Sequence, residues 1–305
     1  MNIALLLQEK NTLSARIEKT LYGSVDIREQ NGKKYLYVHF REDGVSRTKY
    51  AGEYSTELHN LILGNNALVK QYKKRLKEIN KELGAIQYTS SALTDAVKLN
   101  VDLARRNLVD SIYKQAVLEG VATTYSDTET IVQGGKVNDM TASDISKVVN
   151  LKRAWEFILG EGVITYPTNF TILCQINEIV EDGFSYTAGK IRSVPVAIGG
   201  SQYVPPIPFE SKVKEDLQAI LSQEPSYDVA VELLLYVMKK QLFLDGNKRT
   251  AVIIANHYLI GHGMGTIVIP AESVSEYKKL LIRYYENDDP EIKDFILKNC
   301  LTKIK

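Results

Sequence analysis

The sequence predicts a mostly α-helical protein, with a helical bundle in its C-terminal two thirds and a helix–β-hairpin–helix module before it. Apolar residues recur at helical spacing through most of the chain, whereas within residues 24–50 the period changes to two. A junction at residues 84–91, rich in small and polar residues, separates the two parts. We therefore expect an N-terminal module at residues 1–90 and a helical domain at residues 91–305.

The N-terminal module is expected to begin with an amphipathic helix over residues 1–20. Its apolar positions follow helical spacing: Ile3, Leu6, Leu7, Leu13 and Ile17. Residues 35–40 alternate between two faces, as in a strand, and Asp43-Gly44 supplies a hairpin turn. Leucines among charged residues then predict a long helix over residues 55–83.

The helical domain is expected to contain many helices joined by short connections. The predicted helices cover residues 92–118, 127–133, 141–159, 168–181, 210–222, 227–240, 251–260, 273–285 and 290–300. The helix over residues 141–159 is strongly indicated, because Ser143-Asp144 can cap it and one apolar stripe runs from Ile145 to Ile158. A short extended piece is expected at residues 266–269.

The segment Q-L-F-L-D-G-N-K-R-T at residues 241–250 lies between two of these apolar helices. Asp-Gly-Asn is a turn that also caps the following helix, and the N–H groups of a helix start attract anions. Gly246 lets a phosphate approach closely, Lys248 and Arg249 add positive charge, and Asp245 can hold a divalent cation. The local chemistry predicts a site for nucleotide phosphates and Mg²⁺, although D-G-N is also a common surface loop whose basic neighbours are only solvated.

This segment resembles the signature of the Fic (Fido) family, H-x-F-x-[DE]-[GA]-N-[GK]-R. Family members typically transfer AMP, or less often another phosphate-containing group, from a nucleotide onto a protein hydroxyl. Residues 189–206 resemble the family's β-hairpin flap, and Leu118-Glu119-Gly120 resembles the end of its inhibitory helix. The resemblance covers residues 95–300 and implies a Fic-type helical bundle with a β-hairpin flap.

The resemblance assigns roles to the residues of the loop. It implies that Phe243 is a structural anchor and that Asp245 holds Mg²⁺. Gly246, Asn247 and Lys248 match the phosphate-binding positions. Arg249 matches the arginine that contacts the nucleotide phosphates. ATP, or another nucleotide, and Mg²⁺ are therefore the expected ligands.

The resemblance also implies a docking site and a regulatory residue. The flap residues expected to dock a target protein by strand addition are Gly189, Arg192, Val194, Val196 and Tyr203. Glu119 stands at the inhibitory glutamate. However, Val252 replaces the arginine that commonly pairs with it, and Gln115 occupies the usual Ser/Thr position. Glu119 is thus either an inhibitory residue without its usual partner or a simple helix-end carboxylate.

The main departure from the family pattern is Gln241, which stands where the family has the catalytic histidine. A neutral amide cannot act as a general base, and the loss of a base typically lowers a rate by about 10²–10⁴-fold. His257 lies about 15 Å farther along the helix, at 1.5 Å per residue, and cannot replace it. His262 follows that helix and is expected in its C-cap region. We expect a catalytically impaired protein.

Composition fits a soluble globular protein, with 44% apolar and 25% charged residues among 305 and a net charge of +1. The two cysteines, Cys174 and Cys300, are too few for a disulfide framework. The N-terminus lacks the features of a signal peptide, and no apolar run is long enough for a membrane span. These features predict a cytoplasmic protein without membrane association.

Two alternatives to an impaired Fic protein stay open. In the first, the protein is an active transferase with another base; its N-K-R-T-A run resembles the Doc branch of the family, whose members are more like kinases. In the second, the protein is an adaptor whose N-terminal module binds nucleic acid or a partner. Residues 1–90 carry 15 Lys and Arg against 10 Asp and Glu, with a dense basic run at residues 70–77. Alternatively, the basic run at residues 70–77 is only the solvent-exposed face of a helix that packs against another helix. A helical N-terminal arm is also compatible with a homodimer.

Overall fold

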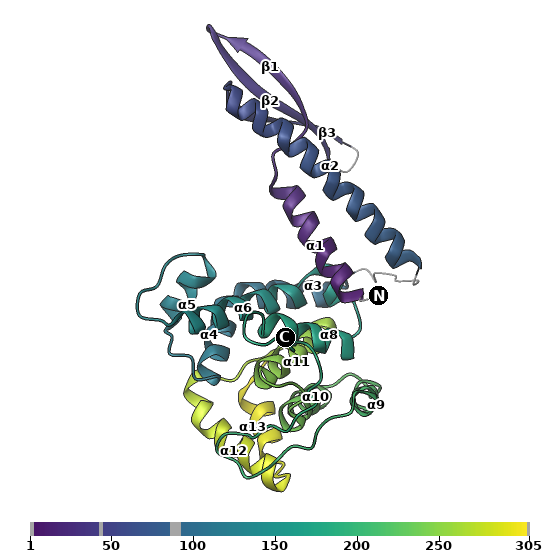
Figure 1. Ribbon diagram of the computed structural model, residues 1–305, viewed down its shortest axis with the longest axis vertical. Helices are drawn as coiled ribbons and strands as arrows, with labels where there is room; N and C mark the ends of the chain where they lie inside the picture. Colours follow the sequence, from purple (N-terminus) through teal and green to yellow (C-terminus); the bar gives the residue numbers. More distant parts are fainter. Residues whose placement is uncertain (1–2, 43–44, 86–92, 304–305) are drawn as a thin grey trace. The chain divides into compact units, whose positions relative to one another are not determined.

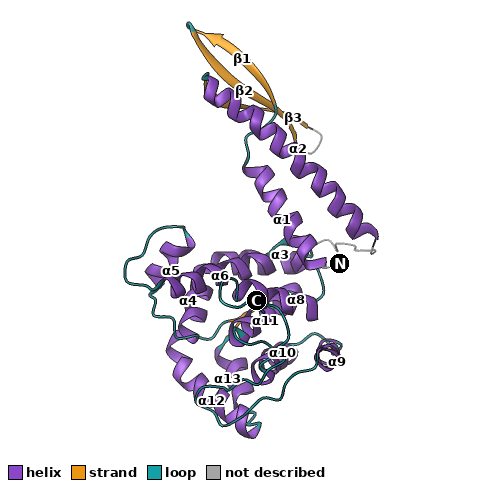
Figure 2. Ribbon diagram, viewed as in Figure 1, coloured by secondary structure: helices purple, strands orange, loops and turns teal. Residues whose placement is uncertain are grey.

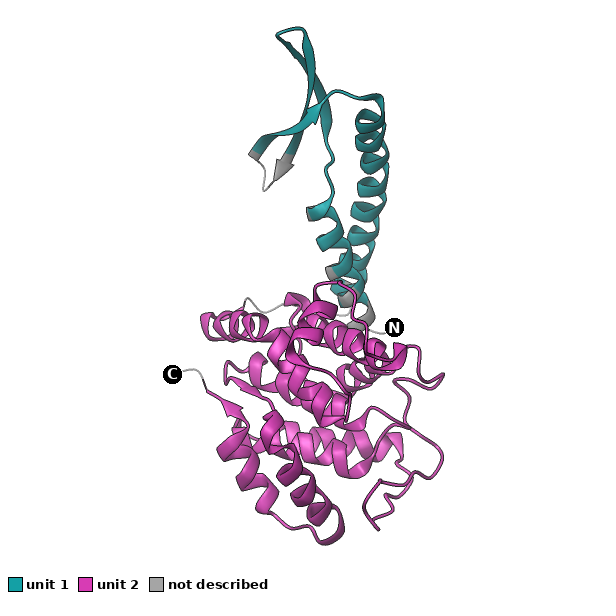
Figure 3. Ribbon diagram, turned by 90° about the vertical axis from the view of Figure 1, so that its left-hand side faces the viewer, with its two compact units in different colours: residues 1–89 teal, residues 90–305 magenta. Residues whose placement is uncertain are grey.

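The computed structural model describes residues 3–42, 45–85 and 93–303, and the chain divides into two compact units, residues 1–89 and 90–305 (Figure 3). Helices predominate and the sheets are small, so the mostly α-helical class is confirmed (Figure 2). Among the described residues, no helix has the length and apolarity needed to cross a membrane.

The N-terminal unit contains two helices and an antiparallel sheet with the strand order β1-β2-β3 (Figure 1). In chain order its elements are α1 (Ile3–Lys19), β1 (Ser24–Gln30), β2 (Lys33–Glu42), β3 (Val45–Glu53) and α2 (Thr56–Ala85). The prediction of a single hairpin is wrong because Asn31-Gly32, with φ of 53° and 74°, forms an additional tight turn between β1 and β2. The predicted turn at Asp43-Gly44 lies outside the described residues, as do residues 86–92 of the predicted junction.

The core of this unit lies between the sheet and α2. Leu36 and Val38 of β2 are fully buried together with Ile62 of α2, as alternation along the strand requires. The basic run at residues 70–77 has a structural use, since Arg75 pairs with Glu9 of α1 at 2.8 Å and with Glu82 at 3.2 Å. The positive charge of Arg75, within this basic run, therefore links α2 to α1.

The C-terminal unit is built from helices with one short two-stranded sheet (Figure 1). Its first helices are α3 (Asp95–Arg106), α4 (Leu108–Leu118), α5 (Tyr125–Val132), α6 (Ala142–Ile158), α7 (Glu161–Ile164) and α8 (Phe170–Val180). Its later elements are α9 (Glu210–Leu221), α10 (Tyr227–Lys240), α11 (Asn247–Gly261), β4 (Thr266–Ile267), a 3₁₀ turn (Ala271–Ser273), α12 (Val274–Asn287), α13 (Glu291–Asn299) and β5 (Leu301–Thr302). The single helix predicted over residues 92–118 is broken into α3 and α4 at Asn107.

Helix α11 is the core helix of this unit. From Asn247 to Ile260 every residue except Lys248 is buried, and α6, α8 and α10 pack against it. A helix that is covered on all sides is held rigidly by its neighbours. The loop before α11 is therefore attached to a helix that is buried along almost its whole length.

The predicted β-hairpin flap is not formed. Residues 191–209 contain no helix or strand, and only a turn, closed by Ser201 N–H to Ile198 O at 3.1 Å, is present near the expected tip. Prolines in this segment lack the N–H that a strand ladder needs. The guanidinium of Arg192 instead donates to the carbonyls of Val194, Pro205 and Pro206. Side-chain bonding replaces strand pairing here.

Candidate functional site

The loop between α10 and α11 turns sharply at two residues with positive φ. Gln241, the C-cap of α10, has φ 47° and ψ 61°, and Gly246, the N-cap of α11, has φ 72°. A Cβ atom at Gly246 would lie 2.6 Å from Oε1 of Glu181, so only glycine fits there. Between these turns Phe243 is buried, in the position expected of an anchor.

Asn247 holds this loop in shape. Its Oδ1 accepts a hydrogen bond from Phe243 N–H at 2.9 Å, and its Nδ2 donates to Phe243 O at 2.8 Å and to Gln241 Oε1 at 3.2 Å. The side chain is buried, so these bonds are shielded from water. Asn247 thus contributes to the site through its side chain as a scaffold rather than as a ligand.

Gln241 is engaged at both ends of its amide. Its Nε2 donates to Met238 O at 2.6 Å, and its Oε1 accepts from Asn247. The side chain carries no group that titrates near neutral pH. The Gln241 side chain therefore links the end of α10 to the start of α11 by hydrogen bonds. It supplies no general base.

The start of α11 provides backbone donors. The first intrahelical bond runs from Thr250 N–H to Gly246 O at 2.8 Å, so the amides of Asn247, Lys248 and Arg249 precede it. Such amides and the helix dipole favour an anion. Next to them the Asp245 side chain is 76% exposed. One exposed carboxylate beside a phosphate-type site fits Mg²⁺, which is commonly held by one or two carboxylates together with substrate phosphates.

Arg249 does not project into solvent, contrary to the expectation that it contacts phosphates directly. Its side chain is 4% exposed and its Nη2 lies 2.8 Å from Oε1 of Glu181, which is itself 2% exposed. Asp245 and Glu119 follow at 3.7 Å each, and Val180 O lies 3.5 Å from Nη1. Arg249 is thus the centre of a cluster of three carboxylates.

Glu181 has an unusual acidity. Burial raises the pKa of Glu181 to about 7; Arg249 opposes this effect, while Asp245 and Glu119 add to it. Sequence reasoning did not identify Glu181. A signal exists, because Asn177 and Glu181 are polar residues four apart at the end of a very apolar helix and so share one face.

Glu119 finds partners other than the absent arginine. Its carboxylate lies 3.6 Å from Lys248 Nζ and 3.7 Å from Arg249 Nε, while Val252 is buried in the core. Gln115, one turn earlier on α4, donates to Arg249 O at 2.8 Å and thereby fixes the end of α4 beside the loop. The inference that Glu119 had lost its partner is corrected: Lys248 and Arg249 both pair with it.

The residues expected in the flap have different surroundings. Arg192 is 3% exposed and donates from Nε to Gln241 O, while its N–H donates to Leu242 O at 3.0 Å. Arg192 is therefore buried and bonded to the backbone of the loop, and its role in target docking stays a prediction. Gly189 is structural as well, since its N–H donates to Asn177 Oδ1 and a Cβ there would lie 2.8 Å from Cys174 O. Asn177 also donates to Asp245 O at 3.0 Å and so links the flap to the loop.

The other three flap residues lie nearer the surface. Val194 is exposed and Val196 is half-buried. Tyr203 stacks on Tyr285 of α12, with ring centroids 6.4 Å apart and an interplanar angle of 22°. Of the five predicted flap residues, Val194 is therefore the exposed one.

A cavity of about 320 Å³ lies where the flap turn, the loop and α12 meet. Its lining residues are Ala197, Ile198, Gly199, Gln241, Lys248, Lys278, Leu281, Ile282 and Tyr285. The four residues from α12 were not predicted, because nothing in the local sequence indicates that this helix reaches the loop. Apolar side chains and two lysines that line this cavity therefore lie next to Gln241.

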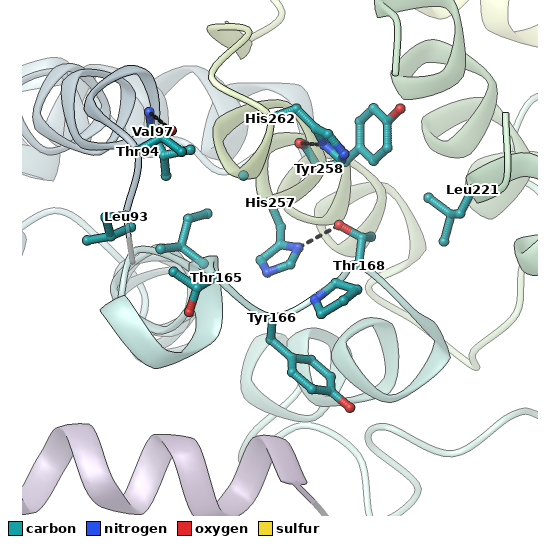
Figure 4. A pocket seen from close by; sticks show the side chains of 13 residues that line it. Leu93, Thr94, Val97, Thr165, Tyr166, Thr168, Leu221, His257, Tyr258 and His262 are labelled. Atoms are coloured by element: carbon teal, nitrogen blue, oxygen red, sulfur yellow. Dashed lines mark hydrogen bonds between the residues drawn. The ribbon is translucent and has the colours of Figure 1, made fainter. Parts of the chain in front are cut away.

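A second cavity of about 330 Å³ lies around His257 and His262, near the other end of α11 (Figure 4). The Nδ1 atom of His257 is 2.8 Å from Thr168 Oγ1, and its Nε2 atom is 2.9 Å from Val163 O. Burial lowers the pKa of His257 to about 4, so the ring is neutral near pH 7. His262 is the C-cap residue of α11, as predicted. Neither histidine is available to the loop at residues 241–249.

Comparison with known proteins identifies one family. The model of the Fic/DOC family matches residues 167–259, which include α8, the flap segment, the loop and most of α11. No curated protein sequence matches the chain.

Solved structures with a similar fold include the C. elegans protein Fic-1, with 16% identity and a TM-score of 0.53 over 79% of this chain and 76% of that one. A Fic domain containing signaling protein from Bacteroides thetaiotaomicron shares 19% identity, with a TM-score of 0.50 over 66% of this chain and 79% of that one. A Fic family protein from Desulfovibrio desulfuricans shares 17% identity, with a TM-score of 0.52 over 68% of this chain and 72% of that one. At these identities the likeness establishes the fold.

We predict that Glu181 makes the stability of the C-terminal unit pH dependent. Its folded pKa of about 7 exceeds the ordinary value of 4.5 for a glutamate, so the folded state holds the extra proton between these values. The stabilisation is present below pH 4.5 and is lost as the pH rises through 7, on the order of 2 kcal/mol. Glu181→Gln should flatten this decline. Urea unfolding followed by the fluorescence of Trp155, which is the sole tryptophan, measures it.

The matched control is Glu178→Gln, which alters an exposed glutamate on the same helix and should leave the pH profile of the wild type. Equal slopes between pH 5 and 8 for the wild type and Glu181→Gln would contradict the raised pKa.

Proposed function

This chain carries a Fic/DOC family region at residues 167–259, and we propose that it is a Fic-fold nucleotide-binding protein with impaired transfer activity. In this proposal the loop at residues 241–249 binds the phosphates of ATP or another nucleotide together with Mg²⁺. Transfer of AMP to a protein hydroxyl is slow, because no residue of the loop accepts the proton of that hydroxyl.

The proposal rests on the chemistry and the hydrogen bonds of the Gln241 side chain. Its amide nitrogen bonds Met238 O, its amide oxygen bonds Asn247, and neither atom is a base near neutral pH. His257 is not supported as a substitute general base, since it is buried and bonded at both ring nitrogens. The arrangement favours binding over transfer.

Nucleotide binding is supported by the donors at the start of α11 and by the exposed Asp245. Mg²⁺ bound there would neutralise phosphate charge and orient the phosphates. Asp245 is the residue that would hold it, and the amides of residues 247–249 would face the phosphate oxygens. The apolar walls of the adjoining cavity suit the non-phosphate part of a nucleotide.

Two further parts of the proposal concern regulation and partners. Glu119 would restrain nucleotide binding, because its carboxylate already forms ion pairs with Lys248 and Arg249. These are the cations that would otherwise attract a phosphate. A target protein would dock beside Val194 and Val196. Two unpaired cysteines, Cys174 and Cys300, are compatible with a cytoplasmic location.

The Doc-like alternative, an active phosphotransferase, has Lys248 as its support, since this lysine lines the cavity beside Gln241. The second alternative is a nucleic-acid-binding adaptor. One observation favours it: Tyr37 and Tyr50 are paired on the sheet face opposite the buried core, with Arg28 stacked 4.6 Å from the Tyr37 ring centroid. Such aromatic groups can stack on unpaired bases.

We expect Gln241→His to raise transfer at least about tenfold, because a positioned base typically contributes 10²–10⁴-fold. Histidine also tolerates the positive φ of this position better than most residues. Self-labelling with ATP carrying the label at the α- or the γ-phosphate measures AMP transfer and phosphoryl transfer separately. Gln241→His combined with Asp245→Ala is the inactive control. Wild type that labels as fast as Gln241→His would refute the impaired-transfer proposal.

We expect Glu119→Gln to strengthen binding of Mg²⁺-ATP by about fivefold or more, since the apparent affinity falls with the fraction of sites that are accessible. Isothermal titration calorimetry measures this affinity. Glu156→Gln, at an exposed glutamate paired with Lys152, is the control and should leave the affinity unchanged. Equal affinities for wild type and Glu119→Gln would mean that Glu119 is only a helix-end carboxylate.

For the adaptor alternative, we expect the full chain to bind a single-stranded oligonucleotide with an affinity that falls steeply between 50 and 200 mM salt, as phosphate contacts require. Tyr50→Ala should weaken binding about fivefold or more. Tyr186→Ala, at a fully exposed tyrosine of the C-terminal unit, is the control. Absence of binding in a gel-shift assay at low salt would remove this alternative.

A further inference from the structure

The first half of helix α2 exposes leucines on the face turned away from the sheet. On its other face Ile62 is fully buried in the core that α2 forms with the sheet (Figure 3). Leu61, Leu63 and Leu68 lie outside this core and are 59%, 49% and 45% exposed. Exposed apolar patches that are this concentrated mark sites of interaction.

The exposed arc of this half is uncharged and has small residues at its centre. Residues 58–69 contain no Asp, Glu, Lys or Arg, whereas residues 70–82 of the same helix contain eight. At 3.6 residues per turn, the exposed Gly64 and Ala67 lie between the leucines. Small side chains let a second helix approach closely, because the distance between packed helices depends on the side chains in contact. This surface therefore suits another helix better than a phosphate-rich ligand.

The patch is complementary to itself when two α2 helices run antiparallel about a twofold axis near residue 66. Leu68 of each copy then packs onto Gly64 of the other copy. Glu57 and the exposed Lys74 lie on opposite sides of the axis, about 14 and 12 Å from it at 1.5 Å per residue, so each faces its opposite charge. A parallel pair would instead place the basic run at residues 70–77 against itself. Charge therefore favours the antiparallel pair.

We propose that the exposed face of α2 over residues 57–75 is the interface of a homodimer, in which α2 of one chain packs antiparallel on α2 of a second copy. The same patch serves both chains, as in twofold-symmetric dimers generally. A contact between two helices of this length, about 28 Å at 1.5 Å per residue, is small, so a dissociation constant in the micromolar range is expected. This proposal is independent of nucleotide binding.

The test is sedimentation velocity of the full chain. Wild type should change from monomer to dimer between about 1 and 100 µM, as a micromolar dissociation constant requires. Leu68→Glu should raise that constant at least about tenfold, because symmetry places the new carboxylate in the interface twice. Leu99→Glu is the matched control, since it changes a leucine of 54% exposure on α3 and should dimerise as wild type does.

Two further variants test the antiparallel arrangement. Glu57→Lys should weaken the dimer about threefold, the scale of an exposed ion pair formed twice, and Glu57→Lys combined with Lys74→Glu should restore it. Ala67→Cys lies next to the axis and should form a disulfide across the dimer on mild oxidation. Lys74→Cys should not, because its two copies are about 24 Å apart along the helices. Wild type, with its own cysteines, provides the background.

A wild type that stays monomeric up to about 100 µM would overturn the proposal, and so would equal dissociation constants for Leu68→Glu and Leu99→Glu. A disulfide in Lys74→Cys but none in Ala67→Cys would overturn the antiparallel interface. A monomeric wild type that binds vesicles of anionic phospholipid, and loses this binding in Leu68→Glu, would assign the face to a membrane instead. An unchanged helical circular dichroism signal and thermal unfolding midpoint of dilute Leu68→Glu verify that it is folded.

Discussion

The ion pair between Arg249 and Glu181 is the interaction on which the site depends. It joins α11 to the end of α8 inside the protein, where the guanidinium offsets part of the cost of burying the Glu181 carboxyl group. Removing one partner of such a pair typically destabilises a protein by about 3–5 kcal/mol. Because Glu119 and Asp245 also approach Arg249, three segments of the chain are oriented by one guanidinium. The charge that the family motif supplies for phosphates is used here largely for structure.

The loop itself is held by side chains that bond to backbone atoms. Asn247 bonds both the N–H and the carbonyl of Phe243, and Arg192 bonds the carbonyl of Gln241. Asn177 bonds the carbonyl of Asp245 and the N–H of Gly189. These bonds fix the direction of the amides at the start of α11 without any contribution from a ligand. A site of this kind is preorganised, which lowers the entropic penalty of binding.

Sequence patterns predicted the features that depend on local periodicity and short motifs. Helix α11 and the loop before it followed from an apolar run and an Asp-Gly-Asn turn. The extra strand was missed because Asn31-Gly32, a strong hairpin signal, was not used. The flap failed for a different reason: Arg192 satisfies carbonyls that a strand would have paired, and no local pattern reveals such a tertiary bond. The contribution of α12 to the cavity beside Gln241 was missed for the same tertiary reason, although the helix itself was predicted.

Gln241 has a left-handed backbone conformation, with φ of 47°. A non-glycine residue at φ 47° is strained and persists only where the surroundings determine it. Here the surroundings are the Arg192 bond to its carbonyl and the helix bond from its N–H to Val237 O, neither of which involves the side chain. Two backbone bonds therefore hold this position in addition to the side-chain bonds to Met238 O and Asn247. Under the proposed function, a glutamine at this position would remove proton transfer while the amides at the start of α11 stay in place.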